Sequence, residues 1–168
     1  RPGPGRIHRE ASDQALTQLL SGRLAMASGR FEAAAGFLER ATQIDPTIGR
    51  AHQLLGALYA RQGKLEVARQ QLHAELLLGP HPIPQLYQIG RLLLDLQDYG
   101  AAAACFRRVV ERDAAHTDAW VNLGVAECEA LNLDTGIEAF RNALALSPKM
   151  IAAHHNLALA MSDKGNWP

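Results

Sequence analysis

Seven histidines are the residues of this chain whose chemistry could include metal binding or proton transfer. They are His8, His52, His73, His81, His116, His154 and His155. A metal site on a helix needs imidazoles about one turn apart, so that they aim at one point. The adjacent pair His154 and His155 fails this requirement, because neighbouring residues on a helix diverge by about 100°. We therefore expect neither a metal nor a cofactor.

The other reactive residue types form no constellation either. Cys105 and Cys128 are too few for a disulfide framework and have no Cys-x-x-Cys spacing. We expect two ordinary thiols, with a single bridge between neighbouring helices as the alternative. The sequence also has no Gly-rich phosphate loop, no His-Glu-x-x-His motif and no Gly-x-Ser-x-Gly motif. These observations predict that the chain is not an enzyme.

The composition favours an all-α protein with no net charge. Of 168 residues 48% are hydrophobic and 5% aromatic, so the core must come from Ala and Leu, which are good helix formers. Lys and Arg number 17 and Asp and Glu number 17, so no net charge attracts nucleic acid. No apolar run reaches the roughly 20 residues of a membrane span. We expect a soluble protein, most simply a cytoplasmic one.

The elements that position these residues recur every 34 residues. One repeat position holds Gly22, Gly56, Gly90, Gly124 and then Ala158. Small residues are needed where two helices approach closely. Later positions hold Ala34, Ala68, Ala102 and Gly136, and four residues on Leu38, Leu72, Phe106 and Phe140. This i, i+4 spacing puts small and large residues on one helical face, where successive hairpins can interdigitate.

Turn signals separate the helices of each repeat. Gly-Arg, Gly-Lys, Gln-Asp and Leu-Asn precede Phe31, Leu65, Tyr99 and Leu133, and Gly-Asn precedes Trp167. Pro46, Pro80 and Pro148 close three of the repeats, with Ala114 in the other. The string Trp120-Val121-Asn122-Leu123-Gly124, with Gly136, Phe140, Ala143 and Pro148 after it, resembles the tetratricopeptide repeat. The resemblance implies a right-handed superhelical solenoid of antiparallel helix pairs, the first helix of each pair lining a concave groove.

The repeat predicts four full units and part of a fifth. Residues 1–14 would be a linker and the start of the first helix, and residues 151–168 the first helix of a truncated fifth unit. The full units are 15–48, 49–82, 83–116 and 117–150. We expect a fragment of a longer chain, beginning in a linker. Two departures from the pattern are Glu75, expected to reach solvent or pair with a cation, and the proline-rich joint 79–84.

The resemblance also implies which side chains face the groove. Those expected to bind a peptide are Arg23, Arg50, Gln53, Arg61, Tyr87, Gln88, Arg91, Asn122, Glu129, His155 and Asn156. Among them Gln88, Asn122 and Asn156 share one repeat position, similar to the asparagine ladder of the O-linked N-acetylglucosamine transferase superhelix. The alternative is that these amides simply fill exposed helical positions. The groove changes sign along the sequence, with arginines early and Asp118, Glu129 and Asp163 late.

These features predict a protein-interaction scaffold that holds a peptide or a partner protein in its groove. One alternative is a substrate-recruiting region of a larger enzyme, such as a glycosyltransferase. Another is a self-assembling array, because an uncapped C-terminal face can pair with a second copy. Nucleic acid and membrane insertion are not expected.

Overall fold

The computed structural model describes residues 4–166, with side chains described for residues 9–165, and its regular elements there are all α-helices. The helices are α1 (Pro4–Ala27), α2 (Phe31–Ile44), α3 (Ala51–Arg61), α4 (Leu65–Leu77), α5 (Ile83–Asp95), α6 (Tyr99–Arg112), α7 (Thr117–Glu129), α8 (Leu133–Leu146) and α9 (Ile151–Asn166). They form two compact units that meet in sequence at Pro80 and His81, within the proline-rich joint. The predicted all-α class is confirmed.

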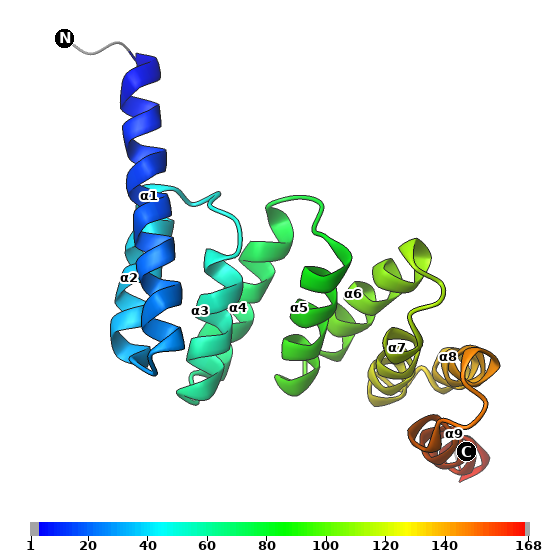
Figure 1. Cartoon of the computed structure of the whole chain (residues 1–168). Coiled ribbons are helices and arrows are strands. Elements are labelled where there is room, and N and C mark those ends of the chain that lie inside the picture. Colours follow the sequence, from blue (N-terminus) through cyan, green and yellow to red (C-terminus); the bar gives the residue numbers. More distant parts are fainter. Residues whose placement is uncertain (1–3, 167–168) are drawn as a thin grey trace. The chain divides into compact units, whose positions relative to one another are not determined.

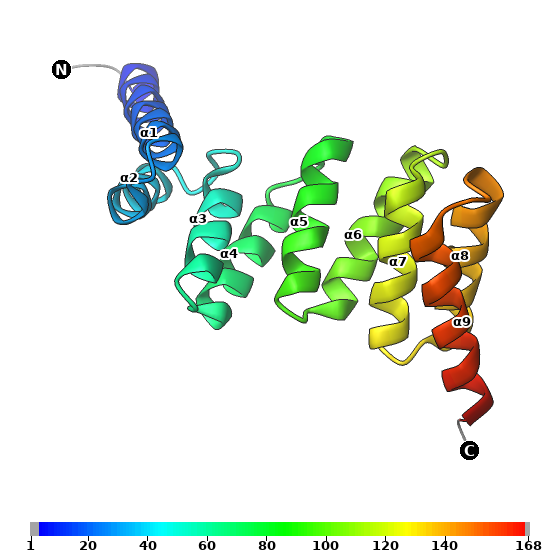
Figure 2. The same cartoon turned by 60° about the horizontal axis from the view of Figure 1, so that its bottom comes forward.

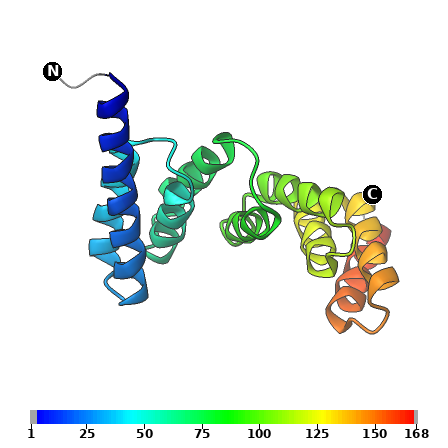
Figure 3. The same cartoon turned by 45° about the horizontal axis from the view of Figure 1, so that its top comes forward.

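Unit 1, the part up to Pro80, contains the helix pairs α1/α2 and α3/α4. Figure 3 shows α1 (blue) running beside α2 and extending well past it. The first helix, which the sequence analysis expected to start within residues 1–14, begins at Pro4. The helix pairs share a core of small and aliphatic side chains, among them Ala34, Leu38, Ala51 and Leu55. Their burial holds α2 against both α1 and α3.

Unit 2, the part from His81 onward, contains the pairs α5/α6 and α7/α8 followed by α9. The first helices α5, α7 and α9 neighbour one another, and α6 and α8 pack against them (Figures 1 and 2). Phe140, at 1% exposed, lies in the core between α7, α8 and α9 with Val121, Ile137 and Ala160. Trp167 and Pro168, which the sequence places at the next turn, lie outside the described residues.

The glycine position shared by the repeats lies where the two helices of one pair touch. A Cβ added to Gly56 would lie 2.8 Å from Leu72 Cγ, and one added to Gly90 would lie 2.9 Å from Phe106 Cε1. Gly22 and Gly124 face Leu38 and Phe140 in the same way. The close approach expected from the sequence is confirmed. At these positions each glycine contacts the large side chain of its own pair.

The short turns inside the helix pairs share one backbone conformation. Gly29 and Gly63 have φ angles of 73° and 74°, and the residues at the same repeat position, Gln97 and Leu131, have 59° and 66°. This left-handed region reverses the chain at a helix end, and glycine adopts it most easily. The turn is thus kept in all four pairs, although two of them place a non-glycine residue there.

Glu75 on α4 stabilises the start of α3. Its side chain is 1% exposed, and its two carboxylate oxygens accept the backbone N–H groups of Arg50 (2.9 Å) and Gln53 (3.1 Å). A helix N-terminus has unpaired N–H groups and a partial positive charge, so a carboxylate is a favourable partner. The prediction that Glu75 reaches solvent is wrong, because this capping role buries it.

Ring nitrogens of one tryptophan and two histidines form hydrogen bonds to the segments that connect successive helix pairs. Trp120 Nε1 donates to the carbonyl of Ala114 at 2.9 Å, and at the same repeat position the Nε2 atoms of His52 and His154 bond the carbonyls of Pro46 and Pro148. Each bond spans six residues and anchors the connecting segment to the helix that follows it. His52 also forms a hydrogen bond with Gln71 on its paired helix, whereas the side chain of His154 is exposed.

Candidate functional site

The first helices of unit 2 present most of the predicted peptide-binding residues. We define the first-helix surface of unit 2 by the side chains of Tyr87, Gln88, Arg91, Asn122, Glu129, His155 and Asn156 on α5, α7 and α9. All of these side chains are exposed or half-buried. The 34-residue repeat places Gln88, Asn122 and Asn156 at one position on three neighbouring helices.

Tyr87 and Asn122 join two of these helices directly. The Asn122 Nδ2 amide donates to the Tyr87 hydroxyl, 3.0 Å away. The tyrosine ring lies edge-on to Phe106, with 5.8 Å between ring centres, and its centre is 4.8 Å from that of His116. Burial is the main cause that raises the pKa of Tyr87, and the hydrogen bond from Asn122 partly opposes it. The ring is therefore held in place on the surface.

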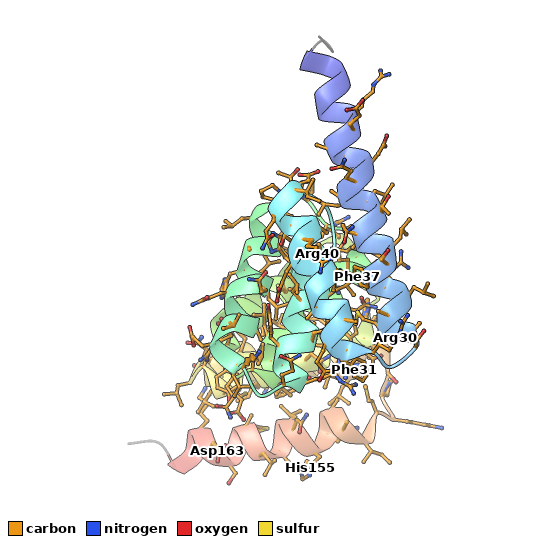
Figure 4. The ribbon with its side chains drawn as sticks, turned by 90° about the vertical axis from the view of Figure 1, so that its left-hand side faces the viewer. Arg30, Phe31, Phe37, Arg40, His155 and Asp163 are labelled. Atoms are coloured by element: carbon orange, nitrogen blue, oxygen red, sulfur yellow. The ribbon has the colours of Figure 1, made fainter. Side chains whose placement is uncertain are left out.

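A hollow of about 130 Å³ opens between α7 and α9. Its apolar lining comes from Val125, Phe140, Leu159 and Ala160, and its polar lining from Cys128, Glu129, Asn156 and Asp163. The two carboxylates stand on different helices, Glu129 on α7 and Asp163 on α9. Figure 4 shows Asp163 and His155 along α9. The hollow therefore combines apolar walls with two negative charges and an amide.

The pKa values of the two thiols reflect their burial and the charges around them. Burial raises the pKa of Cys128, and the carboxylates of Asp163, Glu129 and Glu127 raise it further. Burial also raises the pKa of Cys105 to about 11. Both cysteines are free, as expected for ordinary thiols, and neither is activated as a nucleophile.

In unit 1 the predicted residues lie on α1 and at the two ends of α3. Arg23 is exposed on α1, whereas Gln53 is only 7% exposed and offers little surface to a ligand. The Arg61 guanidinium stacks over the Phe31 ring, 4.2 Å from its centre, so part of its binding capacity is used inside the unit. Figure 4 labels Phe31, and also Arg40, whose guanidinium lies 5.7 Å from the centre of the Phe37 ring.

Three histidine rings, those of His52, His116 and His154, form structural hydrogen bonds. His116 Nδ1 accepts the N–H of Ala119 and so caps α7. His81, within the proline-rich joint, is 6% exposed, and its carbonyl accepts a hydrogen bond from Arg112 at 2.6 Å. Among the described residues, no group of three or more His, Cys, Asp and Glu could hold a metal ion. In the same part of the chain, no helix is both long and apolar enough to cross a membrane.

Sequence reasoning missed a buried carboxylate on the other side of α7. Glu127, at 3% exposed, accepts hydrogen bonds from Arg107, Asn132 and Thr135, which come from α6 and the α7–α8 turn region. A hollow of about 250 Å³ lies beside it, lined partly by Trp120 and Val110. The available signal was a charge at a repeat position that otherwise holds Ala25, Tyr59, Leu93 and Met161.

Comparison with known proteins identifies the repeats. Two family profiles, both described as tetratricopeptide repeat, match residues 25–86 and 87–151. The peroxisomal targeting signal receptor of Saccharomyces cerevisiae is 32% identical over 83 residues, which cover 49% of this chain and 14% of the receptor. The chain thus spans a small part of the length of such curated relatives.

Solved structures share the fold. YrrB, described as a tetratricopeptide repeat protein with an unusual peptide-binding site, has a TM-score of 0.78 at 20% identity, covering 96% of this chain and 84% of that chain. MamA has a TM-score of 0.75 at 22% identity, covering 91% and 84%. Together with the helix pairs and the recurring glycine and turn positions, these matches confirm the solenoid fold class. The chain belongs to the tetratricopeptide repeat family, whose repeats serve as scaffolds for protein–protein interaction.

Proposed function

We propose that the first-helix surface of unit 2 binds an extended segment of a partner protein. The observation that carries this proposal is the row of amides formed by Gln88, Asn122 and Asn156 at one position on α5, α7 and α9. Each amide offers two donors and an acceptor, so a row of them can bond the N–H and C=O groups of an extended backbone whatever its side chains. This use of the row is similar to the asparagine ladder of the glycosyltransferase superhelix.

Two members of the row adjoin other features of the first-helix surface. Asn122 donates to Tyr87, and Asn156 lines the hollow between α7 and α9. The relatives support the same ligand class, since one is named as a receptor for a targeting signal and another as carrying a peptide-binding site.

The experiment is a selection of binders from a library of random 12-residue peptides displayed on phage. We expect the whole chain to select peptides, and the variant Gln88→Ala, Asn122→Ala and Asn156→Ala to bind them at least tenfold more weakly, since each lost hydrogen bond contributes about 1 kcal/mol. The matched control is Gln43→Ala, Gln70→Ala and Asn142→Ala on α2, α4 and α8. Equal losses in both triple variants, or no selected peptide at all, would contradict the proposal.

The arginines of unit 1 form the second part of this proposal. Arg23, Arg50 and Arg61 are exposed on unit 1, where they would attract acidic side chains of a partner segment bound to that unit. Reversing Arg50 and Arg61 to Glu is expected to weaken the binding of acidic peptides. An unchanged affinity would exclude this role of the arginines and leave the amide row unaffected.

A second copy of the chain is the other partner that a specific observation favours. On α9 Ile151 is 83% exposed and Met161 is 52% exposed, so this helix presents apolar side chains to solvent. We expect the chain to self-associate through α9 at high concentration, and Ile151→Asp with Met161→Asp to abolish that association. Light scattering over a concentration series measures both, and a wild-type monomer throughout the series would refute self-assembly.

A further inference from the structure

The hollow between α7 and α9 is the most specific feature of the first-helix surface. We propose that it receives a basic side chain, arginine or lysine, of the bound peptide, with Glu129 and Asp163 holding the cation. This inference rests on the proposed peptide binding and adds to it the chemistry that one position of the ligand must have.

The first argument is the distribution of charge around the hollow. Its lining residues include two carboxylates and no basic residue. Lys164, which directly follows Asp163 in sequence, is paired with Asp134 on α8 and not with the carboxylates of the hollow. Within the described part of the chain, neither Glu129 nor Asp163 forms a hydrogen bond or an ion pair. An external cation is therefore the partner that these two charges fit best.

The second argument is the effect of these carboxylates on a neighbouring group. Cys128 lies in the lining between them, and after burial the carboxylate of Asp163 is the largest cause that raises the pKa of its thiol, followed by that of Glu129. Both carboxylates are therefore near Cys128, in agreement with their shared place in the lining. A negative potential of this kind attracts a cation and disfavours an acidic side chain.

The third argument is the match between the walls and the stem of a basic side chain. Lysine and arginine carry a flexible apolar stem of methylene groups that packs on apolar surface while the charged end stays polar. Val125, Leu159 and Phe140 offer such a surface, and the two carboxylates stand beside it on opposite helices. Asn156, also in the lining, joins the hollow to the amide row that would hold the peptide backbone.

The test uses the same random 12-residue library on the whole chain. We expect wild-type selections to be enriched in Arg or Lys at one position. The neutral variant Glu129→Gln with Asp163→Asn should lose that enrichment, and Glu129→Lys with Asp163→Lys should select Asp or Glu instead. The matched control is Glu111→Lys with Glu138→Lys on α6 and α8, which changes the charge equally and should keep the basic preference.

A second measurement locates the contact. The basic residue of a selected peptide is replaced by citrulline or norleucine, which keep its length without the charge. Calorimetry should show about a tenfold loss of affinity for the wild type and almost none for the neutral variant, as expected for a coupled pair. Peptides selected without a basic preference, or an equal loss in both proteins, would overturn this inference while leaving peptide binding intact. The absence of any selected peptide would overturn both.

Discussion

The side-chain amide of Asn122 on α7 donates a hydrogen bond to the Tyr87 hydroxyl on α5, with 3.0 Å between Nδ2 and Oη. Both residues were expected to face the ligand, and the structure shows that they also bind each other. A peptide that takes this N–H must replace the tyrosine as its acceptor, whereas the second N–H and the carbonyl of the same amide stay available. The bond therefore links the shape of the first-helix surface to the availability of its amide row.

Replacing Tyr87 by Phe separates the packing of the ring from its hydrogen bond to Asn122. The ring contacts with Phe106 and His116 remain, whereas the acceptor of Asn122 is removed. We expect a selected peptide to bind equally well or a few-fold more tightly, because the amide no longer has to leave a partner, while stability falls by about 1 kcal/mol. Fluorescence anisotropy with a labelled peptide measures the affinity. A loss as large as that of Asn122→Ala would show that the hydroxyl itself contacts the peptide.

Gly124→Ala should destabilise unit 2. The added methyl group would collide with the Phe140 ring, which is 1% exposed and closely surrounded, so the loss is expected to be about 1–3 kcal/mol. Urea unfolding followed by circular dichroism measures it. Gly100→Ala is the control, because nothing lies within 4 Å of its new Cβ and alanine favours helix by up to about 1 kcal/mol. Similar effects of the two variants would rule out packing against Phe140 as the reason for this glycine.

Leu131→Gly should stabilise the protein. Leu131 has a φ of 66° and is 69% exposed. Its backbone is therefore held in a left-handed conformation, and no burial of the leucine side chain offsets that cost. Relief of this backbone conformation is expected to add about 1 kcal/mol to the free energy of unfolding. Leu131→Ala keeps the disfavoured conformation and should give no comparable gain. If alanine stabilises as much as glycine, the benefit comes from removing an exposed leucine and not from the backbone.

Glu75→Ala should cost about 2–4 kcal/mol, because two N–H groups at the start of α3 lose their acceptor in a buried place. Glu75→Gln retains one acceptor oxygen and should cost roughly half as much. Thermal and urea unfolding give both values. Glu66→Ala on the exposed side of the same helix serves as the control and should change stability by less than about 0.5 kcal/mol. Equal effects at both sites would exclude the capping role.

Tyr59 should contribute to the loss of stability at alkaline pH. Burial, and then a 2.5 Å hydrogen bond to Glu39, raise its pKa from 10.0 to about 12. Between these values the unfolded chain loses the phenolic proton while the folded protein keeps it, so this contribution is complete below pH 10 and declines as pH rises toward 12. Tyr59→Phe should therefore show a shallower decline. Parallel pH profiles for the two proteins would refute the shift.

Much of the fold follows from residues that recur at one spacing. The glycines at Gly56 and Gly90, the turn residues before Leu65 and Tyr99, and the large side chains Leu72 and Phe106 all predict helix pairs in which small meets large. These relations hold within one pair, between residues close in sequence, so periodicity alone reveals them. The first-helix positions of Gln88, Asn122 and Asn156 follow in the same way.

The charges that break the pattern needed the tertiary structure. Glu75 could be recognised as a departure from the sequence, but its partners Arg50 and Gln53 are 25 and 22 residues away, and only the crossing of α3 and α4 brings them together. Glu127 likewise meets Arg107 across 20 residues. The sequence by itself determined which positions are helical and which are small, because those depend on local geometry. Tertiary structure decided which polar groups are buried with partners and which stay open to a ligand, because that depends on how neighbouring helices pack.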